Sequence, residues 1–131
     1  MRHVEGSLLI VDDDRCFADT LVLEFKDRGY SVEWLDGLEA VEKQSDLNYR
    51  YAVIDLRLGP DSGLDVIKIV KARSPSTVIA VLTGYGSSET ALRARELGAS
   101  AFLTKPVDID LLESALLGGD PEIEIPAKSR V

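Results

Sequence analysis

Near its amino end the chain reads Leu8-Leu9-Ile10-Val11-Asp12-Asp13, four apolar residues that stop at two adjacent carboxylates. Three later apolar runs also stop at a polar residue: 51–54 before Asp55, 78–82 before Thr83, and 101–104 before Lys105. The carboxyl ends of parallel strands form the ligand crevice of an open α/β sheet, so these side chains are expected to share one pocket. Three acids, a hydroxyl and an ammonium suit Mg2+ and a phosphoryl group.

The pattern of the whole chain predicts a parallel sheet. Short continuous apolar runs are typical of strands buried on both faces, and helical periodicity follows each one. The strand candidates are 8–11, 31–35, 51–54, 78–82 and 101–104. The helix candidates are about 14–28, 38–45, 63–73, 88–97 and 109–117. Five β-then-α units indicate a doubly wound α/β fold with right-handed crossovers.

Length, charge and composition indicate what kind of protein this is and which partners are disfavoured. The 131 residues suffice for one domain, and the formal net charge of −8 disfavours direct binding of nucleic acid by this chain. No apolar run approaches the roughly 20 residues of a membrane span, and the start does not resemble a cleaved signal. The single cysteine, Cys16, agrees with a reducing compartment. We therefore expect a cytoplasmic protein without a membrane partner.

We expect three segments along the chain. Residues 1–6 are predicted to be a mobile amino terminus and residues 7–118 the folded domain. Residues 119–131, which begin Gly-Asp-Pro and contain a second proline, are predicted to be a flexible tail or the start of a linker.

The acids define a candidate metal site. Carboxylates in one crevice repel one another unless a cation joins them, and Mg2+ binds carboxylate oxygens, so Asp12, Asp13 and Asp55 are candidate ligands. A carboxylate beside a metal is also a nucleophile toward phosphorus, which makes Asp55 the candidate for an aspartyl phosphate. Lys105 and Thr83 can then hold the remaining phosphoryl oxygens.

Each of these residues also has a simpler explanation. Acids at 12–14 are typical of a helix N-terminus, Asp55 of a turn, Thr83 of a strand end and Lys105 of an exposed surface. Their joint placement at the strand ends favours the site. Lys105 also precedes Pro106, a candidate for a cis peptide bond.

The same residues resemble the receiver domain of two-component response regulators over about residues 7–118. The resemblance is carried by Asp12, Asp13, Asp55, Gly63, Thr83, Phe102 and Lys105-Pro106. It implies a flavodoxin-like five-stranded sheet of order 2-1-3-4-5. It also implies a phosphorylation switch that is not an enzyme, with a sensor histidine kinase as partner.

The resemblance assigns a role to each matching position. Asp55 would accept the phosphoryl group from a phosphohistidine, and Thr83 and Lys105 would bind that group. Asp13, Asp55 and the backbone carbonyl of Arg57 would bind Mg2+ directly, and Asp12 would reach it through water. Phe102 matches an aromatic that swings inward on activation, although a fixed core aromatic is the alternative.

Two strings, Asp55-Leu56-Arg57-Leu58 and Leu82-Thr83-Gly84-Tyr85-Gly86, are similar to those of redox-responsive regulators that join a receiver to a Fis-type helix-turn-helix. One departure is visible, because the family's usual proline four residues after the phosphorylated aspartate is Gly59 here and Pro60 follows it. The path of this loop is therefore left open. Activation is expected to change the surface of the fourth helix, fifth strand and fifth helix, with homodimerisation as an option.

Three alternatives remain open from the sequence. The chain can be the receiver part of a DNA-binding transcriptional regulator instead of a separate protein acting on an unknown output partner. A haloacid-dehalogenase-type phosphatase would use Asp12-x-Asp14, Thr83 and Lys105, but Cys16 stands where that motif requires threonine or valine. An interaction module that works without phosphorylation is the third.

Overall fold

The computed structural model describes residues 6–84 and 87–118. The predictions for residues 1–5, for the tail from 119 and for part of the loop after Thr83 lie outside those residues. Within the described ranges no helix is long and apolar enough to cross a bilayer. The elements are β1 (Ser7–Val11), α1 (Arg15–Asp27), β2 (Ser31–Leu35), α2 (Leu38–Lys43), β3 (Tyr51–Asp55), β4 (Arg57–Leu58), β5 (Asp61–Ser62), α3 (Gly63–Arg73), β6 (Val78–Thr83), α4 (Ser88–Glu96), β7 (Ala101–Thr104) and α5 (Ile109–Leu116).

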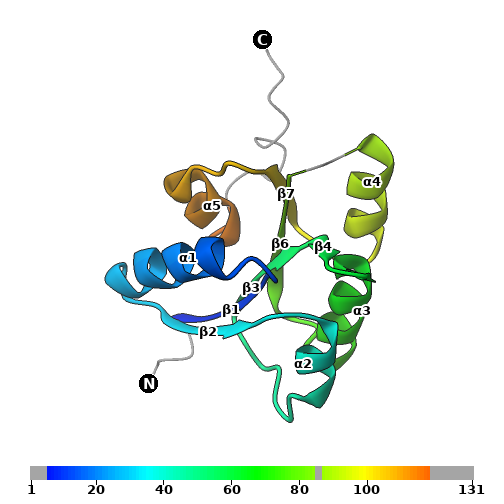
Figure 1. Cartoon of the computed structure of the whole chain (residues 1–131), viewed down its shortest axis with the longest axis horizontal. Helices are drawn as coiled ribbons and strands as arrows, with labels where there is room; N and C mark the ends of the chain where they lie inside the picture. The colour runs from blue at the N-terminus through cyan, green and yellow to red at the C-terminus, as the bar shows by residue number, and fades with distance from the viewer. Residues whose placement is uncertain (1–5, 85–86, 119–131) are drawn as a thin grey trace.

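Five of the strands form one parallel sheet in the order β2-β1-β3-β6-β7 (Figure 1). Counted along this sheet, the order is the expected 2-1-3-4-5, so the predicted fold class is confirmed. The five predicted helices are also present. Helix α3 has its predicted ends, and the others differ by one or two residues, since Asp14 caps α1 from outside and α2 already ends at Lys43.

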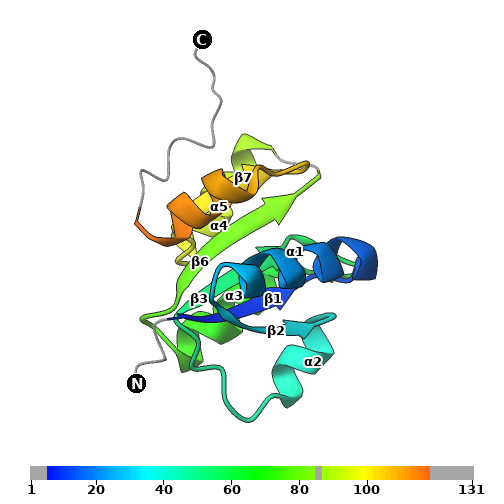
Figure 2. The same cartoon turned by 90° about the vertical axis from the view of Figure 1, so that its left-hand side faces the viewer.

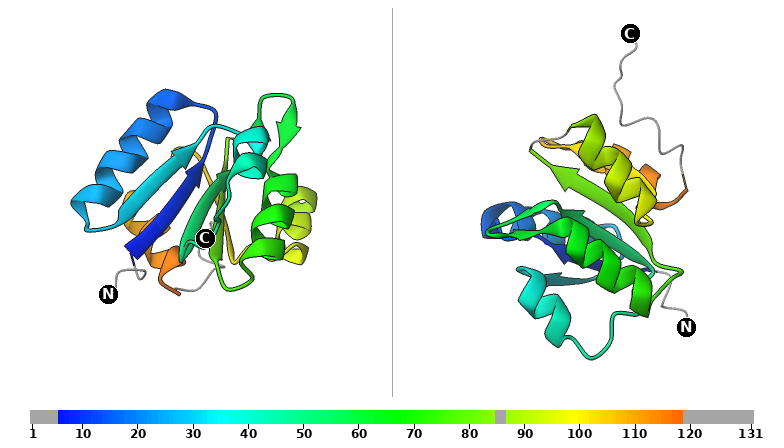
Figure 3. Two further views of the ribbon diagram at one scale, coloured as in Figure 1. Left: turned by 90° about the horizontal axis from the view of Figure 1, so that it is seen from below. Right: turned by 90° about the vertical axis from the view of Figure 1, so that its right-hand side faces the viewer.

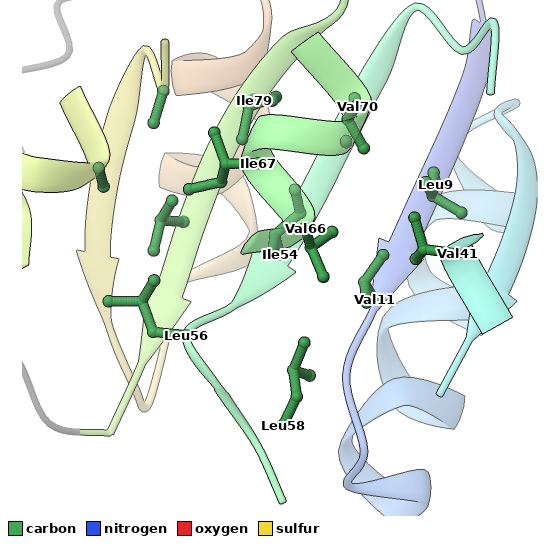
Figure 4. Packing of buried hydrophobic residues seen from close by; sticks show 14 of the residues in the cluster. Leu9, Val11, Val41, Ile54, Leu56, Leu58, Val66, Ile67, Val70 and Ile79 are labelled. Carbon is green, nitrogen blue, oxygen red and sulfur yellow. The ribbon is translucent and has the colours of Figure 1, made fainter. Parts of the chain in front are cut away.

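Alternation along each strand produces two apolar layers. Leu8 and Ile10 of β1 pack with buried residues of α1 and α5, while Leu9 and Val11 pack with those of α2, α3 and α4. Helices α1 and α5 therefore cover one face of the sheet and α2, α3 and α4 cover the other (Figures 1 and 2). Figure 4 shows the second layer, in which Ile67 and Val70 of α3 lie over Ile54 and Ile79.

The segment after Asp55, a predicted loop whose path the sequence leaves undetermined, is a short hairpin. Arg57–Leu58 pairs antiparallel with Asp61–Ser62 around Gly59 and Pro60, and Gly59 adopts φ +65°, where glycine carries no Cβ penalty. Leu58 is only 3% exposed and packs in the apolar layer under α3 (Figure 4). This packing attaches the hairpin to the core. The hairpin lies at the same end of the sheet as the loop that follows β1 (Figure 3, left).

A polar cluster ties α5 to the end of α1. Arg28 Nη1 donates to Glu113 Oε1 at 2.7 Å and lies 2.9 Å from Asp110 Oδ1, while the Tyr30 hydroxyl donates to Glu113 Oε2 at 2.8 Å. Tyr30 and Arg28 thereby lower the pKa of Glu113. Helix α5 is thus fastened by charge as well as by its buried Leu112 and Leu116.

Gly63 allows α3 to begin directly against the end of β3. A Cβ at this position would overlap the backbone carbonyl of Asp55 and the Cα of Leu56, and the Gly63 N–H donates to the Leu56 carbonyl at 2.8 Å. We expect Gly63→Ala to lower the free energy of unfolding by roughly 1–3 kcal/mol, because backbone must move. Urea denaturation measures this change.

The matched control is Gly37→Ala, since nothing lies within 4 Å of a Cβ built at Gly37. We expect this control to stay within about 0.5 kcal/mol of the parent. Equal stability of the two variants would contradict the close approach of α3 to Asp55.

Candidate functional site

The sheet register brings the predicted polar residues to one edge. Asp55 ends β3 opposite Leu82, and Thr83 ends β6 opposite Thr104. The ladder also continues past two strand ends, because the Asp12 N–H donates to the Leu35 carbonyl and the Lys105 N–H to the Thr83 carbonyl. Four strands therefore contribute their ends to one pocket.

One ammonium joins the two buried acids of this pocket. Lys105 Nζ donates to Asp12 Oδ2 and to Asp55 Oδ2, at 3.0 Å each. The acid side chains are 3% and 8% exposed, and that of Lys105 is 20% exposed. Burial lowers the pKa of Lys105, but its bonds with Asp55 and Asp12 outweigh burial and leave the pKa raised. Burial also raises the pKa of Asp12.

Backbone groups orient both carboxylates. Asp12 Oδ1 accepts the Asp14 N–H at 2.9 Å, and Asp55 Oδ1 accepts the Arg57 N–H at 3.0 Å. Trp34 on the neighbouring strand β2 donates its indole N–H to the Asp12 backbone carbonyl at 2.7 Å. Each acid therefore presents Oδ2 to Lys105 while Oδ1 stays bound to the chain.

The three carboxylates among the predicted metal ligands lie together. Asp12, Asp13 and Asp55 each offer an oxygen atom, and these atoms are all within 4.8 Å of one another. Asp13 is exposed, whereas Asp12 and Asp55 are buried, so a cation could enter from the Asp13 side. All three offer carboxylate oxygens, which fits a hard divalent cation.

Thr83 and Phe102 belong to the opposite half of the pocket. Thr83 is fully buried and continues the alternation of Ile79 and Val81, which face α3 and α4. Phe102 is 9% exposed and packs in the same layer, so its ring lies inward in this structure. Whether this ring moves stays a prediction. The Lys105–Pro106 peptide bond is cis.

The sequence did not predict three residues that lie beside Lys105 and its two carboxylate partners. They are Trp34, the capping residue Asp14 and Phe17, whose ring centroid lies 4.1 Å from Lys105 Nζ. Phe17 shares a helical face with Leu21 and Phe25, a spacing that is typical of core packing. No spacing along the chain indicates that this ring contacts the lysine that follows β7.

Comparison with known proteins shows the family to which the chain belongs. A family model described as the response regulator receiver domain matches residues 8–117. The chain belongs to the response regulator receiver family. This result favours the receiver over the phosphatase alternative, and the relatives are named as regulatory proteins, in agreement with a signalling domain that is not an enzyme.

Two similar relatives, named as regulatory proteins, agree with the subgroup that the sequence resembles. The acid tolerance regulatory protein ActR of Sinorhizobium medicae is 46% identical over 114 residues, covering 86% of this chain and 59% of that protein. The photosynthetic apparatus regulatory protein RegA of Rhodobacter capsulatus is 37% identical over 129 residues, covering 95% and 68%. The receiver thus spans about three fifths of ActR.

A solved structure is similar over nearly the whole receiver. It is a response regulator protein from Burkholderia pseudomallei with a phosphorylated aspartic acid, a calcium ion and citrate. The TM-score is 0.86 at 32% identity, and the match covers 96% of this chain and 76% of that one. This similarity supports the receiver fold independently of the sequence motifs.

Removing the ammonium tests the electrostatics of the pocket. In Lys105→Met the buried carboxylates of Asp12 and Asp55 lose their shared partner, so we expect the free energy of unfolding at pH 7 without divalent cations to fall by roughly 1–3 kcal/mol. Burial raises the pKa of Asp12 and Lys105 lowers it, so removing the ammonium raises that pKa further, and the native state of the variant takes up a proton at higher pH than that of the parent. The deficit should therefore shrink from pH 7 to pH 5.

Urea denaturation at both pH values measures this deficit. Lys68→Met is the matched control, since Lys68 is 53% exposed beside Asp65, and it should stay within about 0.5 kcal/mol of the parent. A deficit that does not change with pH would contradict the electrostatic account.

Proposed function

We propose that Asp55 of this receiver accepts a phosphoryl group from the phosphohistidine of a sensor histidine kinase. The observation that carries the proposal is the Lys105 ammonium, 3.0 Å from the carboxylates of both Asp12 and Asp55 at the carboxyl end of the sheet. A carboxylate nucleophile and a cation for the incoming phosphoryl oxygens then face the same space. The phosphorylated aspartic acid in the Burkholderia relative supports the assignment.

The proposed cofactor is Mg2+. Asp13, Asp55 and the backbone carbonyl of Arg57 would bind it directly, and Asp12 would reach it through water. The cluster of three acids and the calcium ion of the Burkholderia relative support a divalent cation here. When bound, Mg2+ would offset the negative charge of the phosphoryl oxygens.

The reaction is a displacement at phosphorus. A carboxylate oxygen of Asp55 forms the new O–P bond while the P–N bond of the phosphohistidine breaks and its electron pair stays on the imidazole. Lys105 moves its ammonium from the carboxylates to a phosphoryl oxygen, and the Thr83 hydroxyl donates to another. The protein supplies mainly position and charge, as in other phosphoryl transfers.

The proposed switch is a change of the surface formed by α4, β7 and α5. The phosphoryl group carries roughly 1.5–2 negative charges and replaces the single charge of the Asp55 carboxylate. The pocket therefore becomes more negative next to Thr83, which ends β6, and Lys105, which follows β7. Helix α4 buries only Ala94 completely, whereas Glu113 of α5 is hydrogen-bonded to the end of α1. A shift of α4 would therefore break fewer stabilising contacts than a shift of α5. Phe102 on β7 would follow this movement.

The proposed partners extend beyond the kinase. Because the receiver spans 59% of ActR, an attached output domain is part of the proposal, and DNA binding would belong to that domain. A separate output protein is the alternative. Homodimerisation on activation would use the α4–β7–α5 surface, which exposes Leu92 on α4. The proposed location is the cytoplasm.

The test is incorporation of phosphate from acetyl phosphate with Mg2+, measured by intact mass. Asp55→Asn removes the nucleophilic oxygen, so incorporation should fall at least about 100-fold, to background. Asp65→Asn, an exposed acid on α3, is the matched control and should behave as the parent does. Full incorporation into Asp55→Asn would refute the assignment.

A further inference from the structure

Lys105 has a third neighbour that the proposed chemistry does not use. Besides the two carboxylates, Nζ faces the ring of Phe17 on α1, 4.1 Å from the ring centroid. This distance is well within the roughly 6 Å over which an ammonium is attracted to the face of an aromatic ring. The side chain of Lys105 is 20% exposed, so part of its water has been replaced by these contacts.

Asp14 binds the backbone of Phe17. Asp14 caps α1, and its Oδ1 accepts the Phe17 N–H at 3.1 Å. The Asp14 N–H in turn donates to Asp12 Oδ1, whose other oxygen accepts Lys105. These contacts link four residues in a ring: Asp12, Asp14, Phe17 and Lys105. Asp14 therefore connects Phe17 to the charged site in addition to capping α1.

We propose that Phe17 is a positioning residue for Lys105 during phosphoryl acceptance. This inference rests on the proposed function and names a further residue for it. A lysine side chain loses much rotamer freedom when it is fixed, and the Phe17 ring restricts it before the phosphodonor arrives.

The aromatic ring is suited to this task because it is neutral. A carboxylate in its place would attract the ammonium more strongly, but it would add negative charge to a pocket that must also hold the charge of the phosphoryl group. The ring attracts Lys105 without repelling the phosphoryl group. Lys105 can therefore leave Asp55 for a phosphoryl oxygen and still remain near Phe17.

Packing alone is the competing explanation, since Phe17 also lies against the apolar layer under α1. The two explanations differ in what they require of the ring. Packing depends on its volume and shape, whereas attraction to Lys105 depends on the electron density of its face. Progressive fluorination of the ring lowers that density with little change in size.

The first experiment measures the rate of phosphorylation of the full chain by acetyl phosphate with Mg2+. Phe17→Leu should slow it about 2- to 30-fold, the range that a cation–π contact provides. Phe17→Tyr should stay within about 2-fold of the parent. The 4-fluoro- and 3,4,5-trifluorophenylalanine proteins should fall progressively toward Phe17→Leu. Leu23→Ala, on the exposed side of α1, is the matched control and should not change the rate.

The second experiment requires no phosphodonor. Ring currents of Phe17 should shift the Lys105 Hε protons upfield in the NMR spectrum, and comparison with Lys105→Met assigns that signal. The shift should disappear in Phe17→Leu and persist in Phe17→Tyr. Because this readout involves no phosphate, it would still report on the contact if Asp55 proved not to be the acceptor.

The outcomes separate the two proposals. No incorporation of phosphate into the parent would overturn the proposed function, and the positioning role with it, even where the upfield shift is present. Normal incorporation with a rate that does not change across the fluorinated series would overturn only the role of Phe17. An absent upfield shift in the parent would overturn the contact itself.

Discussion

The pocket depends on one arrangement of charge, a single ammonium between two buried carboxylates. Asp12 and Asp55 would repel by roughly 3 kcal/mol at about 5 Å and an effective dielectric near 20. Lys105 lies 3.0 Å from both and cancels much of that repulsion. The same ammonium is also the group that a phosphoryl oxygen would bind. The interaction that stabilises the resting pocket is therefore the one that phosphorylation has to redistribute.

Strand alternation divides this pocket into two halves. Asp12, Asp55 and Lys105 continue the residues that face α1 and α5, whereas Thr83 and Phe102 belong to the side that faces α3 and α4. The charged half consequently contacts α1 through Phe17, and the half beside α4 contains the hydroxyl and the aromatic. A phosphoryl group on Asp55 would bridge the halves, because Lys105 and Thr83 approach it from opposite faces of the sheet.

The sequence predicted the strands and the main charged residues, because buried strands and their polar ends leave a local signal. The strand order followed only from the resemblance to the receiver family. The sequence did not predict Phe17 or Trp34 beside the site, since both contacts depend on how separate segments lie against one another. The hairpin at Gly59 was also missed. Its two-residue strands are too short for periodicity, and burial of Leu58 holds them in place.

The two helices beside β7 differ in how firmly they are attached. Helix α5 has two fully buried leucines and an acid, Glu113, that accepts hydrogen bonds from Arg28 and Tyr30 at the end of α1. Helix α4 has one fully buried alanine and exposes Leu92. A displacement of Thr83 and Lys105 would move α4 more easily than α5, because α4 has fewer fully buried side chains to displace. Helix α1 also carries Phe17, so the helix that contacts the lysine is the one to which α5 is attached. In the proposed switch, α4 would be the helix that moves relative to the charged half and α5.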